Sequence, residues 1–173
     1  MSDSVLSLHN VSKSFGSFKA VDQIDLDIPQ GAIYGFLGPN GAGKTTTIRM
    51  ILDIIRPSSG VINILGSDSA LTVRTRIGYL PEEKGLYKKM KAWAVIQYFA
   101  MLKGMTRQAA KQRAYELLEQ YGLGEFAERK VETLSKGMGQ KVQVLAAVAH
   151  YPELVILDEP FSGLDPLARD EFL

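Results

Sequence analysis

The chain has 173 residues, which is enough for one folded domain of ordinary size. With 46% apolar and 23% charged residues, its composition is that of a globular protein and excludes a disordered tail. The 20 basic and 19 acidic side chains leave a formal charge of +1, and the basic residues are scattered along the sequence, which argues against a nucleic-acid binder. There is no cysteine, which is compatible with a reducing compartment.

The first third of the chain predicts β structure followed by a strand, a loop and a helix. Residues 5–8 and 24–28 alternate apolar with polar side chains, as half-buried strands do. Residues 32–37 form an apolar run that predicts a buried strand. After a glycine-rich loop, residues 44–55 have a helical pattern, which the Pro-Ser-Ser-Gly sequence at 57–60 ends.

Short strands and one helix are expected farther along the chain. Residues 61–65 and 77–80 are strand-like and end at a glycine and a proline. A helix is expected over 137–150. Residues 154–157, Leu-Val-Ile-Leu, are a continuous apolar run of the kind found in a buried parallel strand.

The middle of the chain has two long helical patterns, at 92–102 and 107–121. They predict a helical subdomain over 84–134, inserted within a single domain that covers 1–173. Four side chains at helical spacing are expected to pack its core rather than to face a partner: Trp93, Tyr98, Phe99 and Met101.

Residues 38–45, Gly-Pro-Asn-Gly-Ala-Gly-Lys-Thr, satisfy the phosphate-binding pattern of a glycine, four residues and Gly-Lys-Ser/Thr. Glycines let backbone N–H groups turn inward onto phosphate oxygens, and the N-terminus of the following helix adds positive charge. Lys44 then reaches the β- and γ-phosphates, Thr45 offers its hydroxyl to Mg²⁺, and Thr46 hydrogen-bonds a phosphate. The alternative, an ordinary glycine-rich turn, is disfavoured by the position between a predicted strand and a predicted helix. The predicted nucleotide-binding residues here are Gly38, Pro39, Asn40, Gly41, Ala42, Gly43, Lys44, Thr45 and Thr46.

An acidic pair, Asp158 and Glu159, directly follows the predicted strand 154–157. A carboxylate at the end of such a strand suits Mg²⁺, and this role is assigned to Asp158. Glu159 is then placed to orient and deprotonate the attacking water. Taken alone the pair is equally compatible with a solvated loop, and it is the lysine of the glycine-rich loop that favours the catalytic interpretation.

The sequence Leu-Ser-Lys-Gly-Met at 134–138 precedes the helix expected over 137–150, where Ser135 is suited to cap the helix. With this segment the chain resembles the ABC ATPases, whose signature Leu-Ser-Gly-Gly-Gln it matches at three of five positions. The resemblance implies that Ser135, Lys136, Gly137 and Met138 act on ATP held by a second ATP-binding subunit in a head-to-tail dimer.

The resemblance also implies a fold: an α/β P-loop NTPase with an N-terminal antiparallel β subdomain, a mostly parallel core sheet and an inserted helical subdomain. It implies ATP and Mg²⁺ as cofactors and the hydrolysis of ATP as the reaction. In the family a further core strand, ending in a histidine that contacts the γ-phosphate, follows the acidic pair. This sequence contains neither, and we therefore expect the last core strands to be missing and the domain to be incomplete at its C-terminus.

Other positions receive roles from the same resemblance. Phe15 matches the aromatic residue that stacks on adenine, with a core or hairpin aromatic as its alternative, and Val21 is counted with the nucleotide-binding residues. Glu82 occupies the place of a glutamine that contacts Mg²⁺ and the water. It joins Thr45 and Asp158 as a metal ligand, and Lys44 and Glu159 as a catalytic residue. Asp165 matches a loop that contacts the other subunit.

The run at 81–87, Pro-Glu-Glu-Lys-Gly-Leu-Tyr, is similar to bacterial ATP-binding subunits of ABC-2-type exporters, including those likened to sodium-efflux systems. This implies an ABC-2-type transmembrane permease as partner, no nucleic acid, and a cytoplasmic position on the inner face of the cell membrane. Two alternatives remain open: a truncated module that binds nucleotide without turnover, and an ABC ATPase not coupled to transport.

Overall fold

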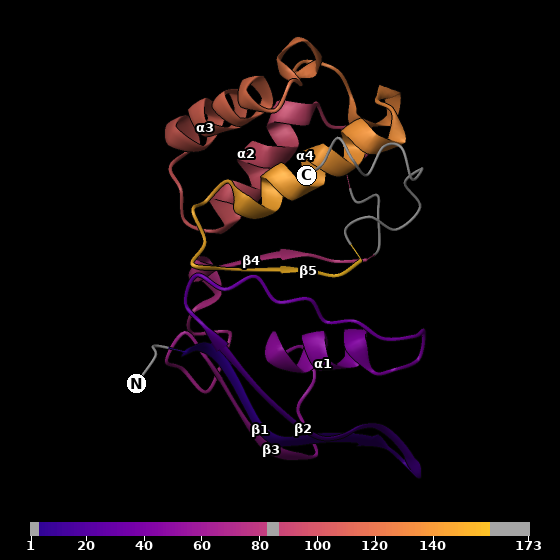
Figure 1. Ribbon diagram of the computed structural model, residues 1–173. Helices are drawn as coiled ribbons and strands as arrows, with labels where there is room; N and C mark the ends of the chain where they lie inside the picture. Colours follow the sequence, from indigo (N-terminus) through magenta and orange to yellow (C-terminus); the bar gives the residue numbers. More distant parts are fainter. Residues whose placement is uncertain (1–3, 83–86, 160–173) are drawn as a thin grey trace. The chain divides into compact units, whose positions relative to one another are not determined.

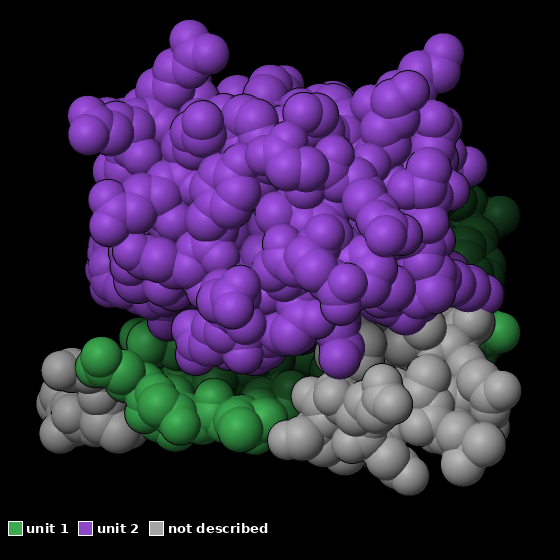
Figure 2. All heavy atoms as spheres, turned by 90° about the horizontal axis from the view of Figure 1, so that it is seen from above, with its two compact units in different colours: residues 1–74 green, residues 75–173 purple. Residues whose placement is uncertain are grey.

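The computed structural model of the chain describes residues 4–82 and 87–159. The chain divides into two compact units, residues 1–74 and 75–173, which are coloured separately in Figure 2. They are called unit 1 and unit 2 below, and each is described by itself.

Unit 1 is built on an antiparallel sheet of three strands in the order β2-β1-β3 (Figure 1). Strands β1 (Ser4–Phe15) and β2 (Phe18–Pro29) form a hairpin, and β3 (Ser59–Ile64) pairs with the other edge of β1. The short turn between β1 and β2 contains Gly16 at φ 59°, a left-handed conformation that glycine adopts without strain. The strands expected at 5–8, 24–28 and 61–65 are confirmed, and the first two belong to much longer strands.

Helix α1 (Lys44–Ile51) is shorter than the helix expected over 44–55. Its buried side chains face the sheet of unit 1, and Ile48 and Met50 are among them. The helix ends early because Asp53 has a φ of 58°, a left-handed conformation that closes helices. The N–H of Ile54 then bonds back to the carbonyl oxygen of Arg49 at 2.9 Å, so residues 52–55 are a turn.

The prediction of a buried strand over 32–37 is wrong for the described structure. These residues form no strand, and the side chains of Ile33 and Leu37 are 103% and 93% exposed. An apolar run becomes a strand only when a neighbouring strand takes its backbone N–H and C=O groups. Within the described residues none of the strands pairs with this segment.

Unit 2 is built around three helices: α2 (Ala92–Leu102), α3 (Arg107–Gln120) and α4 (Lys136–Val148). They share one core, in which Ile96, Leu118 and Val142 are fully buried. This confirms the three expected helices to within one or two residues at each end, whereas the subdomain boundaries 84–134 stay a prediction. None of the helices in the described part of the chain is long and apolar enough to span a bilayer.

The aromatic residues of α2 divide between the core and the surface. Trp93 stacks on Tyr115 with ring centroids 5.8 Å apart, and Phe99 packs against the shared core. Tyr98 and Met101 are 38% and 42% exposed, so of the four residues expected in the core only Trp93 and Phe99 pack against it. Two short 3-10 turns, Gly124–Phe126 and Val131–Thr133, connect α3 to α4, and a third, Arg74–Arg76, precedes β4.

Strands β4 (Ile77–Leu80) and β5 (Leu154–Leu157) confirm the strands expected at these positions, and they pair in parallel (Figure 1). Arg76 and Glu153, the residues that precede the two strands, form an ion pair in which Nη2 and Oε2 are 2.6 Å apart. The prediction that β5 is buried is wrong in part, because Val155 and Leu157 are 40% and 38% exposed. Successive side chains of a strand point to opposite faces of the sheet, and Val155 and Leu157 share the face of β5 that is less covered in the described structure.

Gly78 sets the distance between β4 and the end of α4. A Cβ at this position would overlap the carbonyl oxygen of Ala147 and would lie 3.0 Å from Cγ of Pro152. We expect Gly78→Ala to lower the free energy of unfolding by about 1–3 kcal/mol, because α4 must move away from the strand. Urea unfolding measures the change.

Gly139→Ala is the matched control for that substitution. Gly139 lies inside α4, and an added Cβ would meet no atom within 4 Å. Alanine stabilises a helix interior by about 0.5–1 kcal/mol over glycine, so this variant should be more stable than the parent chain. Equal effects of the two substitutions would contradict the close packing at Gly78.

A second stability determinant is the carboxylate of Glu128. It accepts hydrogen bonds from Nζ of Lys91 at 2.7 Å and from the hydroxyl of Tyr115, and these bonds lower the pKa of Glu128 from 4.5 to about 2. The bonds join the start of α2 to α3 and to the segment that leaves it.

Because the folded pKa of Glu128 lies below its unfolded value, its contribution to stability is complete above about pH 4.5 and is lost as the pH falls toward 2. We expect the difference in unfolding free energy between the parent chain and Glu128→Gln to be constant near neutral pH and to shrink over that acidic range. Urea unfolding at a series of pH values checks this, and a difference that ignores pH would contradict it. Added salt should reduce the difference, since the side chains are exposed.

Candidate functional site

The glycine-rich loop of residues 38–45 runs directly into α1. Gly41 and Gly43 have φ values of 83° and 84°, which turn the backbone in a way that residues with a Cβ rarely adopt. Gly43 is the residue that caps α1, and no side chain bonds to the first N–H groups of the helix from this position. The first turn of α1 contains no acidic residue, so the positive end of the helix is not neutralised locally.

Gly43 also lies against the backbone of β2. A Cβ on this glycine would be 2.5 Å from the carbonyl oxygen of Ala20 and 3.1 Å from Cγ2 of Val21. Val21 is 4% exposed and packs against the loop at Gly43. Its contact with a nucleotide stays a prediction. The sequence offered no signal for this packing, because Ala20 and Val21 carry no motif.

Lys44 folds its side chain over the loop. Its Nζ donates hydrogen bonds to the carbonyl oxygens of Gly38 at 2.7 Å and Pro39 at 3.0 Å. The positive charge is therefore held inside the curve of the backbone. The turn itself is closed by the N–H of Ala42, which bonds to the oxygen of Pro39 at 3.2 Å.

The threonines that follow Lys44 have different surroundings. Thr47 is 1% exposed, and its Oγ1 donates to the oxygen of Gly43 at 2.9 Å, which fixes the junction of loop and helix. Thr45 and Thr46 are half-buried, and Asn40 is exposed. The loop thus combines a lysine ammonium group, a free helix N-terminus and accessible hydroxyl and backbone groups, a set that fits a phosphate chain with a divalent cation.

Phe15, the predicted adenine-stacking residue, ends β1 at the hairpin turn of unit 1. Its ring is 51% exposed, and Nζ of Lys13 lies 5.1 Å from the ring centroid. An exposed aromatic face with a cation beside it is suited to stacking on a base. The alternative of a core aromatic is disfavoured by this exposure.

Three predicted acidic residues lie in unit 2, at the carboxyl ends of two neighbouring parallel strands. Glu82 follows β4, and Asp158 and Glu159 follow β5. The N–H of Asp158 bonds to the oxygen of Leu80 at 2.9 Å, which extends the ladder to the first acid. Among the described residues no group of three acidic or histidine side chains is close enough to hold a metal ion, so the three carboxylates are neighbours without forming a closed cluster.

The two acids of the pair differ in burial. Asp158 is 3% exposed, whereas Glu159 is exposed and has a φ of 49°. This left-handed conformation is uncommon for a residue with a Cβ, and it turns Glu159 away from the direction of the strand. A buried carboxylate beside an accessible one matches a division into a metal ligand and a general base.

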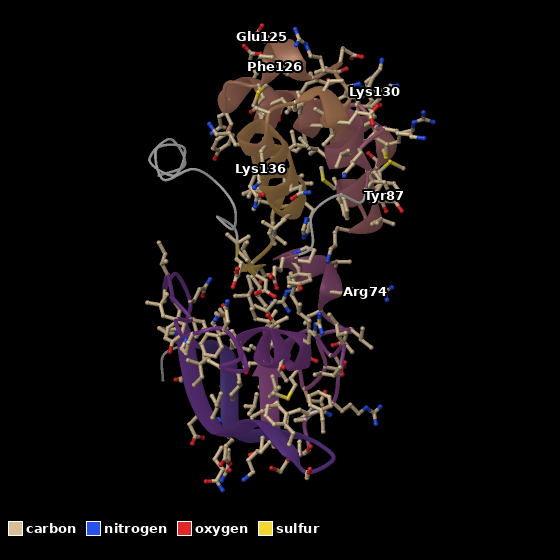
Figure 3. The ribbon with its side chains drawn as sticks, turned by 90° about the vertical axis from the view of Figure 1, so that its right-hand side faces the viewer. Arg74, Tyr87, Glu125, Phe126, Lys130 and Lys136 are labelled. Atoms are coloured by element: carbon tan, nitrogen blue, oxygen red, sulfur yellow. The ribbon has the colours of Figure 1, made fainter. Side chains whose placement is uncertain are left out.

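The signature segment forms the N-terminus of α4. The hydroxyl oxygen of Ser135 accepts a bond from the N–H of Met138 at 3.2 Å, which confirms its capping role. Lys136 is the first residue of the helix and is exposed (Figure 3), and Gly137 is half-buried. Met138 packs against the shared core of unit 2, so the side chain in the place of the family's glutamine is occupied with packing.

The structure brings together the predicted residues in two groups. The glycine-rich loop, Phe15 and Val21 belong to unit 1, and Glu82, the acidic pair and the signature belong to unit 2. Asp165 lies outside the described residues.

Comparisons with known proteins agree with these motifs. The sequence model of the ABC transporter family matches residues 21–162. The chain is 50% identical over 163 residues to the uncharacterised ABC transporter ATP-binding protein YhaQ of Bacillus subtilis, which covers 94% of this chain and 55% of that protein. It is 41% identical over 170 residues to the bacitracin transport ATP-binding protein BcrA of Bacillus licheniformis, covering 96% of this chain and 55% of that protein.

A solved structure described as the ATP-binding subunit of an ABC transporter matches with a TM-score of 0.82 and 32% identity, over 96% of this chain and 71% of that one. The fold and the family model therefore agree. The chain spans about half the length of the curated relatives it matches.

Gly43 provides a test of the loop. We expect Gly43→Ala to weaken binding of Mg-ATP strongly and to lower the free energy of unfolding by about 1–3 kcal/mol, since the new Cβ must displace the backbone of Ala20. Titration with a fluorescent ATP analogue and thermal unfolding measure the two effects.

Gly31→Ala serves as the control for backbone strain. Gly31 has a comparable φ of 78°, but a Cβ there would meet no atom within 4 Å. Its substitution should cost some stability and leave nucleotide affinity unchanged. If both variants bind nucleotide as the parent chain does, the glycine-rich loop is not the phosphate site.

Proposed function

The chain belongs to the ABC transporter ATP-binding family, and from this premise we propose that it binds Mg-ATP and hydrolyses it to ADP and phosphate. The observation that carries the proposal is the position of Lys44, whose Nζ lies within the curve of the glycine-rich loop, 2.7 Å from the oxygen of Gly38. A cation held there by carbonyl oxygens is ready to bind phosphate oxygens without rearrangement of the loop.

The proposed nucleotide and metal ligands come from the glycine-rich loop, from Phe15 and from the two acids that follow β4 and β5. Backbone N–H groups of residues 38–46 and the N-terminus of α1 bind the phosphates, and the ammonium group of Lys44 binds oxygens of the β- and γ-phosphates. Phe15 stacks on the adenine. Thr45, Glu82 and Asp158 are the proposed ligands of Mg²⁺, which when bound neutralises charge on the phosphate oxygens.

Glu159 is the proposed general base. Its carboxylate is exposed at the end of β5, where it can orient a water molecule and take its proton. Glu82, at the end of β4, is proposed to hold the same water and the cation. A carboxylate at this position adds negative charge and cannot donate a hydrogen bond when ionised, which distinguishes it from a glutamine.

The proposal extends to a transporter. In a head-to-tail arrangement with a second ATP-binding subunit, Ser135, Lys136, Gly137 and Met138 of this chain would act on the ATP held by that subunit, and Asp165 is proposed to contact it. An ABC-2-type transmembrane permease is the proposed partner, with this chain on the cytoplasmic face of the membrane. Support comes from family membership and from the relative named for bacitracin transport.

Release of phosphate from Mg-ATP tests the proposed chemistry. We expect Glu159→Gln to retain nucleotide binding and to lower the turnover rate by about 10²–10⁴-fold, the usual contribution of a general base. Lys44→Ala should lose both binding and turnover, because the phosphate charge is no longer balanced.

Three outcomes distinguish the alternatives for this chain. Turnover that depends on Glu159 supports the proposal. Binding of Mg-ATP without release of phosphate by the parent chain would favour a module that binds nucleotide only. Turnover that ignores Glu159→Gln would show that the base is another residue.

A further inference from the structure

A ribbon of two antiparallel segments in unit 2 carries a concentration of positive charge. Residues 88–92 run beside residues 127–132, joined by backbone bonds from Val131 N to Met90 O and from Glu132 N to Lys88 O, both 2.9 Å. Five basic side chains lie on this ribbon and all are exposed: Lys88, Lys89, Lys91, Arg129 and Lys130. They are called the basic ribbon below.

The two segments are far apart in the sequence, and only the fold brings their charges together. Lys91 and Lys130 are paired directly across the ribbon. In Figure 3 the labelled Lys130 lies on the same side of unit 2 as Tyr87, the residue before Lys88. The basic residues are scattered along the sequence, but the fold gathers these five on one surface, which corrects the expectation for them.

The neighbouring acids neutralise only part of this charge. Glu128 pairs with Lys91 at 2.7 Å, and Glu132 lies 4.0 Å from Lys130. Lys88, Lys89 and Arg129 form no ion pair with a carboxylate of the described residues, although Arg129 lies over the ring of Phe126, 5.0 Å from its centroid. The ribbon therefore has a formal excess of three positive charges.

Stability of the fold accounts for Lys91, which is bonded to Glu128, but not for Lys88 and Lys89. Like charges directly opposite each other on paired segments repel, and neither Lys88 nor Lys89 contributes to the shared core of unit 2. Exposed lysines that take no part in the core are more readily explained by a ligand of opposite charge than by folding.

The choice of basic residue indicates what kind of ligand this is. Four of the five are lysines, which act as flexible, hydrated point charges, whereas arginine is the residue suited to fixed, two-pronged recognition of one phosphate or carboxylate. Flexible lysines on an exposed surface match a diffuse layer of negative charge.

We propose that the basic ribbon rests against the anionic lipid headgroups of a membrane surface. The inference rests on the proposed function for the presence of a membrane near this chain, and it adds a direct lipid contact to the contact through a permease. Each lysine near such a surface adds to the attraction, which decays within about 10 Å in ordinary salt.

Co-sedimentation of the full chain with lipid vesicles tests the proposal. Vesicles of phosphatidylcholine mixed with phosphatidylglycerol should bind the chain, and vesicles of phosphatidylcholine alone should not. The double substitution Lys88→Glu and Lys89→Glu should weaken binding to the anionic vesicles by at least about tenfold. Added salt should weaken the binding of the parent chain.

A control variant with the same change of net charge, Lys19→Glu with Arg56→Glu, alters two exposed residues of unit 1 instead. It should keep most of the binding, and circular dichroism should show that both variants are folded. Equal loss of binding in both variants would overturn the proposal, because net charge alone would then attract the chain. Equally strong binding to neutral vesicles, or no binding to anionic ones, would also overturn it.

Tighter ribbon-dependent binding to DNA or to an acidic peptide than to anionic vesicles would also overturn it. The assay contains no nucleotide, so its failure is distinct from failure of ATP binding or hydrolysis.

Discussion

The close approach of Gly43 to the carbonyl oxygen of Ala20 is the constraint on which the candidate phosphate site depends. The absence of a side chain lets the loop fold against β2, and the left-handed φ of this residue starts α1 at that point. Lys44 is the next residue, so the same turn directs its ammonium group back over the loop to Gly38 and Pro39. One backbone feature thus fixes the cation, the helix N-terminus and the threonines together.

The parts of the fold that the sequence predicted well are those with local signals. Helix α2 begins and ends where the apolar period and Gly104 place it, and Ser135 caps α4 as its residue type indicates. The glycine-rich loop and the acidic pair could be located because the phosphate-binding pattern and the apolar run before the acids are local, while their chemical roles stay predictions. The loop lies at the N-terminus of α1 and the acids lie at the end of β5, as the neighbouring patterns indicate.

The features that the sequence could not provide depend on pairing and on distant neighbours. The apolar run at 32–37 predicts a strand, but it does not say whether a partner strand is present, and in the described structure the run is exposed. The end of α1 depends on the left-handed Asp53, and although aspartate adopts that conformation more often than most residues, its presence does not by itself specify it. The support of Gly43 by Val21, and the gathering of lysines from 88–91 and 129–130, exist only once segments far apart in the sequence meet.

The measurement that tests the central claim most directly is amide hydrogen exchange over residues 38–47, with and without Mg-ATP. If backbone N–H groups of the loop and of the first turn of α1 bind the phosphates, Mg-ATP should slow their exchange more than it slows exchange in β1 or α3. Exchange over 38–47 that is unchanged by bound Mg-ATP would contradict the account, because the nucleotide would then be held by a different part of the chain.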